Sequence, residues 1–175
     1  SVRVHIFMRN KSKMNKDELK NSLSKFTKLN DTKFTVGVCV HVPNKMRWAQ
    51  SGNDDIWLQR HLGVYLNKQD RRIYKAAHKN RGVRLKRIVA LEYTVNTGWH
   101  AHLCVQTPDH MSDEDLVAEM GDCWLRYVKK WKSPRFNDDR LFWAKQIKQG
   151  YYEYTIKNGK NILDGNIDWL NTYLG

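Results

Sequence analysis

The feature that most constrains the fold is a pair of β-rich segments joined by a short turn signal. Residues 84–95 and 99–106 are rich in branched and aromatic side chains, and Asn96-Thr97-Gly98 separates them. A three-residue connection that ends in glycine is a common β-hairpin loop. Strands joined by such a loop run antiparallel, so the sequence predicts an antiparallel sheet.

The periodicity of apolar residues predicts the other elements around this hairpin. An edge strand is predicted at residues 1–9, and further strands at 34–42 and 141–147. Helices are predicted at 15–28, at 56–79, from Ser112 onward and at 150–158. We therefore expect one α+β domain over residues 1–175, with helices packed on an antiparallel sheet.

Charge and cysteine content narrow the class of protein. The chain has 31 Lys and Arg against 18 Asp and Glu, a formal net charge of +13. This excess favours a polyanionic partner, nucleic acid first and an anionic membrane surface second. No apolar run approaches the length of a membrane span, so no membrane insertion is expected. The three cysteines are widely spaced, which argues against a disulfide framework and fits a reducing cytosol.

Eight basic residues are concentrated around the predicted end of the helix at 56–79 and the strand that follows it. They are Arg71, Arg72, Lys75, Lys79, Arg81, Arg84, Lys86 and Arg87. Cations of this kind contact phosphates and set the affinity and salt dependence of DNA binding. We predict that this cluster binds DNA, the alternative being a solvated helix surface.

Two histidines, His100 and His102, stand one residue apart on the second strand of the hairpin. Side chains alternate along a strand, so both imidazoles point to the same face. Two imidazoles held side by side on a rigid strand can form part of a divalent-metal site. The alternative is a pair of hydrogen-bonded histidines on a half-exposed sheet.

The turn also predicts a third ligand. If Asn96-Thr97-Gly98 is the loop, Val95 pairs with Trp99 and Glu92 lies opposite His102. Glu92 is the only acid on either strand and falls on the histidine face. Two imidazoles and one carboxylate leave coordination positions open for water and a phosphate oxygen. We therefore predict Mn²⁺ or Mg²⁺ as the cofactor, although Zn²⁺, Co²⁺ or Ni²⁺ could also occupy such a site.

A tyrosine-rich segment follows the hairpin by about fifty residues. On a helix, Tyr151, Tyr154 and Lys157 lie along one edge, whereas Tyr152 is better suited to the core. The unperturbed pKa of a phenol is about 10, so a nucleophilic tyrosine needs help from a cation or a metal. Lys157 could stabilise the phenolate of Tyr154 or hold a phosphate. Tyr151 remains the alternative nucleophile.

Three motifs together resemble the HUH (His-hydrophobe-His) endonucleases of rolling-circle replication. They are Phe34-Thr35-Val36, His100-Ala101-His102 and the YxxK sequence from Tyr154 to Lys157. Glu92 takes the place of the acidic ligand that viral members contribute upstream of the histidine pair. The segments around the basic cluster and the histidines look most like small replication initiators of bacterial plasmids and phages.

The resemblance implies a five-stranded antiparallel sheet of the ferredoxin/RRM-like type, with flanking helices and the metal on its open face. Tyr154 would attack a DNA phosphate, leaving a 5′-phosphotyrosine and a free 3′-OH, and the reverse reaction would rejoin the strand. The implied partners are single-stranded DNA or an origin hairpin in the cytoplasm of a bacterial host. No helicase motif follows the tyrosine, so we expect a separate helicase.

Two other interpretations of these motifs stay open. A single-tyrosine transposase or a mobilisation relaxase uses similar chemistry within the same superfamily. A non-catalytic nucleic-acid-binding domain with an RRM-like sheet would use the basic surface without a metal.

Overall fold

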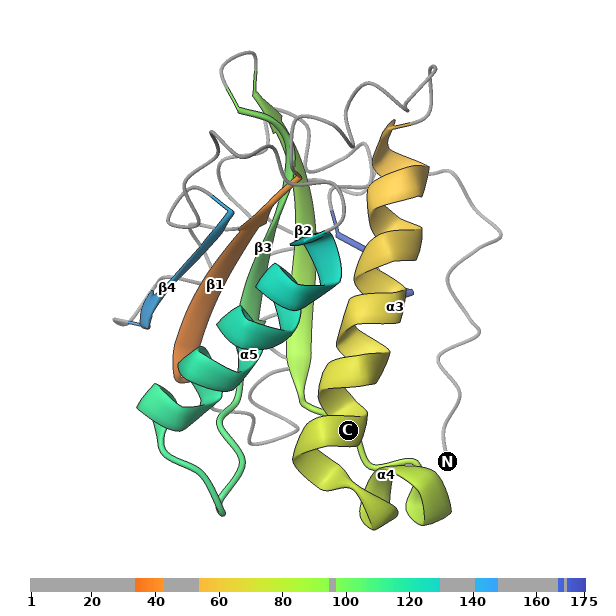
Figure 1. The fold of residues 1–175 in the computed structure, drawn as a ribbon, viewed down its shortest axis with the longest axis vertical. Helices are drawn as coiled ribbons and strands as arrows, with labels where there is room; N and C mark the ends of the chain where they lie inside the picture. The colour runs from red at the N-terminus through yellow and green to blue at the C-terminus, as the bar shows by residue number, and fades with distance from the viewer. Residues whose placement is uncertain (1–33, 43–53, 95–96, 130–140, 148–166, 169) are drawn as a thin grey trace, which may run out of the picture.

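Two long helices cover one face of an antiparallel sheet in the computed structural model (Figure 1). The structure describes residues 34–42, 54–94, 97–129, 141–147, 167–168 and 170–175. The segments predicted at 1–9, 15–28 and 150–158 lie outside the described residues. No helix among the residues described is long and apolar enough to cross a membrane.

The described residues form seven helices and strands in the order β1, α3, α4, β2, β3, α5, β4. Their bounds are Val36–His41 (β1), Asp54–Tyr74 (α3), Ala76–Arg81 (α4), Arg87–Thr94 (β2), Gly98–Val105 (β3), Asp113–Val128 (α5) and Phe142–Gln146 (β4). Within the described residues, the sheet has four strands in the order β2-β3-β1-β4, and every neighbouring pair is antiparallel. The α+β class and the antiparallel hairpin are thus confirmed.

The free edge of β2 is bordered by the last described residues of the chain. Isolated antiparallel bridges join Arg87 to Tyr173 and Ala90 to Ile167. The backbones of Arg87 and Tyr173 exchange two hydrogen bonds of 2.7 and 2.9 Å. Among the described residues, this contact is where a fifth strand would stand, but it consists of bridges and not of a continuous ladder.

The strands divide their side chains between two faces, as the alternation of the sequence requires. One face packs against α3 and α5 and forms the hydrophobic core. The buried residues of this core, from the strands and from both helices, include Val36, Val38, Val40, Leu58, Leu62, Leu103, Leu116, Met120 and Trp124. The other face carries Cys39, His41, Glu92, His100 and His102, and we call it the histidine face.

Local signals predict α5 better than α3. The helix predicted from Ser112 onward is confirmed, and Ser112 caps it, since its hydroxyl accepts a hydrogen bond from the Asp115 backbone N–H at 3.0 Å. The single helix predicted at 56–79 is instead broken at Lys75, which has a φ of 46°. After this break the chain turns back beside α3, where the Leu85 N–H donates to the Asp70 carboxylate at 2.9 Å.

A buried ion pair fixes the junction between α3 and β2. Arg87 Nη1 donates to both carboxylate oxygens of Asp70, at 2.8 and 3.0 Å. Arg87 Nε donates to the Asn171 carbonyl at 2.9 Å, so the pair also holds the C-terminal residues. Arg87 is 4% exposed and Asp70 is 1% exposed, so the two charges neutralise each other out of contact with water.

Candidate metal centre

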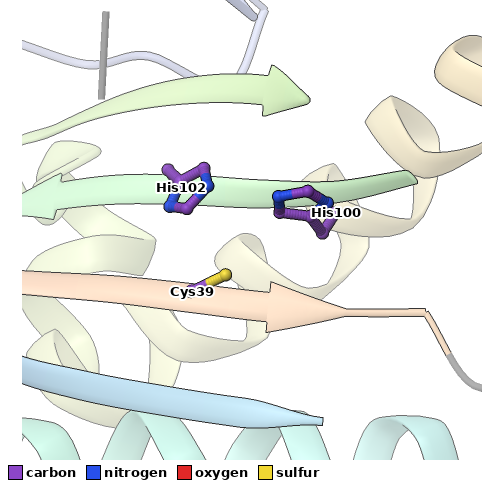
Figure 2. A group of neighbouring side chains, drawn as sticks. All are labelled: Cys39, His100 and His102. Carbon is purple, nitrogen blue, oxygen red and sulfur yellow. The ribbon is translucent and has the colours of Figure 1, made fainter. Parts of the chain in front are cut away.

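The histidine pair lies on β3 and points away from the helices (Figure 2). His100 is 5% exposed and His102 is half-buried, whereas Ala101 between them is buried in the core. The prediction that the two imidazoles share one face is confirmed. Because β3 is an interior strand of the sheet, its pairing to both neighbours holds the two rings in place.

The register of the hairpin differs from the predicted one by two residues. The structure pairs Thr94 with Gly98, so Glu92 lies directly opposite His100 and not opposite His102. Gly98 has a φ of 67°, which glycine adopts readily, and it begins β3 instead of ending the loop. The Thr94 hydroxyl accepts a hydrogen bond from a loop N–H at 3.1 Å. A shift of two residues preserves the face of every side chain, so Glu92 remains beside the pair.

Glu92 contacts both imidazoles through a single carboxylate oxygen. Its Oε2 lies 2.9 Å from His102 Nε2 and 3.3 Å from His100 Nε2. His100 Nδ1 lies 3.0 Å from the Gly98 carbonyl oxygen, which only accepts, so this nitrogen carries the hydrogen. In that tautomer the Nε2 of His100 turns a lone pair toward the Glu92 carboxylate. Two electron-rich atoms in that position are stabilised by a cation between them.

Cys39 adds a fourth donor that the sequence did not identify. It lies on β1 opposite His102, and one ligand atom from each of Cys39, His100 and His102 lies within 4.8 Å of the others. Figure 2 shows the sulfur pointing from β1 toward the two rings on β3. The sequence feature that could have identified Cys39 is its alternation with His41 on a predicted strand, which places both side chains on one face. Its meaning depends on the pairing of β1 with β3, which the local sequence does not specify.

A second thiol on the same face takes no part in the cluster. Cys104 follows His102 by two residues on β3 but packs against Ile88, with Phe34 and Leu174 nearby. It is 1% exposed. Cys104 therefore contributes to packing on this face.

His41 supports the site from beside Cys39. Its Nε2 lies 3.2 Å from the Cys39 sulfur. Its ring stacks on that of His100, with centroids 4.9 Å apart and planes 15° apart. His41 therefore restrains the orientation of both the thiol and one imidazole.

Burial makes neutral side chains favourable in this cluster. Burial, followed by the negative charge of Glu92, raises the pKa of the Cys39 thiol to about 12. Burial and then the proximity of His100 lower the pKa of His102, while Glu92 opposes that shift. A neutral imidazole is the form that binds a metal, whereas the thiol must lose its proton on binding.

The predicted DNA-binding cluster is only partly available at the surface. Arg71, Lys75, Lys79, Arg81 and Arg84 are exposed around α4, and Lys86 is partly exposed. Two members are engaged elsewhere. The prediction for Arg87 is wrong, because its guanidinium is buried against Asp70.

The other engaged member is Arg72, on the last turn of α3. It is exposed but forms ion pairs with Glu119 and with Asp122, the latter at 2.9 Å. These two acids on α5 neutralise its charge locally, so it adds little to the positive surface around α4.

The predicted nucleophiles belong to the segment between β4 and the last described residues of the chain. Tyr151, Tyr154 and Lys157 all lie outside the described residues. The nearest described residues on either side are Ile147, whose N–H bonds the Thr35 carbonyl at 2.7 Å, and Ile167. Ile147 follows β4 and Ile167 borders β2, so they lie at opposite edges of the sheet.

Comparison with known proteins finds no family model, no curated protein and no solved structure that matches this chain. The chemistry of the site therefore rests on its own geometry. That geometry brings the Cys39 thiol close to both imidazoles and places the Glu92 carboxylate against the same two rings from the neighbouring strand. Imidazole, thiol and carboxylate are groups that bind divalent cations.

Proposed function

We propose that this protein is a metal-dependent, site-specific endonuclease and strand transferase of the HUH type. It acts on single-stranded DNA or an origin hairpin, nicks through a 5′-phosphotyrosine intermediate and rejoins the strand to initiate rolling-circle replication. The proposal includes a five-stranded ferredoxin-like sheet, a separate helicase as partner and a location in the cytoplasm of a bacterial host. The observation that carries it is the Glu92 oxygen that faces both histidine Nε2 atoms.

Two imidazoles and one carboxylate suit a divalent cation, and the cofactor proposed for nicking is Mn²⁺ or Mg²⁺. His100, His102 and Glu92 would hold it, and it would polarise a DNA phosphate so that a weak nucleophile can attack. The Tyr154 phenol gives up its proton to solvent, and its oxygen forms a bond to phosphorus as the bond from phosphorus to the 3′ oxygen breaks. That oxygen takes up a proton from solvent and leaves as a 3′-OH. Lys157 stabilises the phenolate, and the released 3′-OH later reverses the reaction.

An exposed aromatic side chain beside the centre supports a single-stranded substrate. Trp143 on β4 lies directly opposite Cys39, so its side chain belongs to the histidine face. Its ring is 44% exposed, and the Lys145 ammonium lies 4.9 Å from the ring centroid. An exposed ring next to a cation suits an unpaired base and its phosphate.

A nicking assay with the full chain tests the function. Circular single-stranded DNA of mixed sequence is incubated with the protein and Mn²⁺, and covalent adducts are separated under denaturing conditions. We expect an adduct in the wild type that chelation removes, that Tyr154→Phe abolishes and that Tyr151→Phe retains. An adduct that survives in Tyr154→Phe but not in Tyr151→Phe would show that the nucleophile is assigned wrongly. DNA binding without any adduct would favour the non-catalytic RRM-like domain.

Replacing Trp143 with alanine is expected to weaken the binding of a short single-stranded oligonucleotide. Loss of one stacked base costs about 1–3 kcal/mol, which corresponds to about a 5- to 150-fold rise in Kd. Fluorescence anisotropy in the presence of a chelator measures this Kd without cleavage of the oligonucleotide.

The matched control for that variant is Tyr93→Ala. Tyr93 is 57% exposed on the opposite face of the hairpin, where its ring lies 5.6 Å from that of Trp99. It should leave the affinity unchanged, and an equal loss in both variants would contradict a stacking site at Trp143.

A further inference from the structure

A thiol ligand distinguishes this centre from one built only of nitrogen and oxygen donors. Cys39 is 5% exposed, and its sulfur lies with both imidazoles in a group no wider than 4.8 Å between ligand atoms. Glu92 lies against the same two imidazoles from β2, whereas Cys39 reaches them from β1. The four donors therefore come from three adjacent strands and approach the histidine pair from either side.

The chemistry of this donor set selects among metals. Mg²⁺ prefers oxygen ligands in near-ideal octahedral geometry and retains several waters. Thiolate and imidazole favour softer ions, and Zn²⁺ takes four such ligands at a tetrahedral site. The buried Cys39 thiol thus shifts the preference of the site away from Mg²⁺.

We propose that Cys39 is a protein ligand of the centre and that the ion bound most tightly is Zn²⁺. The thiol releases its proton to solvent as the bond from sulfur to the metal forms. His41, 3.2 Å from the sulfur, orients the thiol from outside the coordination sphere. This inference concerns the same pocket as the proposed function but does not require that the protein cut DNA.

The consequence for that proposed function is a competition for coordination positions. Three protein ligands leave a position for a phosphate oxygen, whereas a fourth one closes a tetrahedral site. Cys39 must therefore leave the ion, or the ion must accept a fifth ligand, before a phosphate can bind. Zn²⁺ held by all four donors is expected to be the resting state of the site.

Cobalt substitution of the full chain tests the ligand directly. A thiolate bound to Co²⁺ gives a charge-transfer band in the near ultraviolet, which imidazole and carboxylate ligands do not give. We expect this band in the wild type and in Cys104→Ser and Cys123→Ser, and its loss only in Cys39→Ser. Cys104 is the matched control, because it is equally buried on the same face two residues from His102.

Competition titrations with a chromogenic chelator supply the second readout. Cys39→Ser is expected to weaken Zn²⁺ binding by about 100-fold or more while changing Mn²⁺ binding much less. Cys39→Ala provides a second variant if the serine is poorly tolerated, and circular dichroism of both apo variants reports whether they fold. A band that persists in folded Cys39→Ser, or that is absent from the wild type, would overturn the assignment. Failure to nick DNA would leave the band unchanged and would count only against the proposed function.

Discussion

The double variant His100→Ala/His102→Ala is expected to lose metal-dependent nicking entirely while it keeps its affinity for single-stranded DNA. The two imidazoles supply both nitrogen ligands, and the remaining Glu92 carboxylate and Cys39 thiol are too few to hold a cation tightly. Affinity persists because the exposed cations around α4 are untouched. Adduct formation with Mn²⁺ measures the first effect, and anisotropy with a chelator measures the second.

Milder substitutions distinguish the loss of a metal ligand from a general disruption of the site. Glu92→Gln keeps an oxygen donor but removes its charge, so we expect metal binding weakened by about 10- to 100-fold. His78→Ala is the histidine control. His78 lies on α4, away from β3, where its ring bonds the Val83 carbonyl at 3.0 Å, so this variant should nick normally. Nicking that survives in the double variant would contradict the histidine site, and full activity in Glu92→Ala would exclude the carboxylate as a ligand.

Removing the carboxylate of Asp70 is expected to destabilise the protein by about 3–5 kcal/mol. Asp70→Ala leaves the Arg87 guanidinium 4% exposed and without its counter-charge. It also leaves the Leu85 N–H without its acceptor at 2.9 Å. Urea denaturation followed by circular dichroism gives the change in the free energy of unfolding.

The surface ion pair of Arg72 provides the comparison. Arg72 is bound by Asp122 at 2.9 Å but is exposed, so Arg72→Ala should cost no more than about 1 kcal/mol. The double variant Asp70→Leu/Arg87→Met replaces both buried charges by apolar groups and should recover most of the loss. If Asp70→Ala does not fold but the double variant does, the result still shows that an unpaired buried charge destabilises the protein. A loss below about 1 kcal/mol in Asp70→Ala would contradict it.

The sequence was most informative where a local pattern determines the structure. Alternation along the hairpin placed Glu92, His100 and His102 on one face, and the Ser112 signal located the start of α5. Both results depend on residues within a few positions of one another. The shared face holds even though the register was predicted two residues out, because the side chains of a strand repeat every second residue.

What the sequence missed depends on contacts between distant segments. Cys39 becomes a candidate ligand only because β1 pairs with β3, 63 positions further along the chain at His102. Arg87 was grouped with its basic neighbours, but its partner Asp70 lies across the junction between helix and strand. Propensity and charge describe each residue alone, so neither pairing follows from them.

The bridges between β2 and the last described residues also bear on how the protein meets other copies of itself. A strand at the border of a sheet presents unpaired N–H and C=O groups, which can template pairing with a neighbouring molecule. Here Arg87 exchanges both backbone hydrogen bonds with Tyr173, and the Val89 carbonyl accepts one from Asp168 at 2.9 Å. The Val89 N–H donates to the Thr172 hydroxyl at 3.1 Å. These contacts occupy the backbone groups of this part of the border, so a second molecule cannot add a strand there.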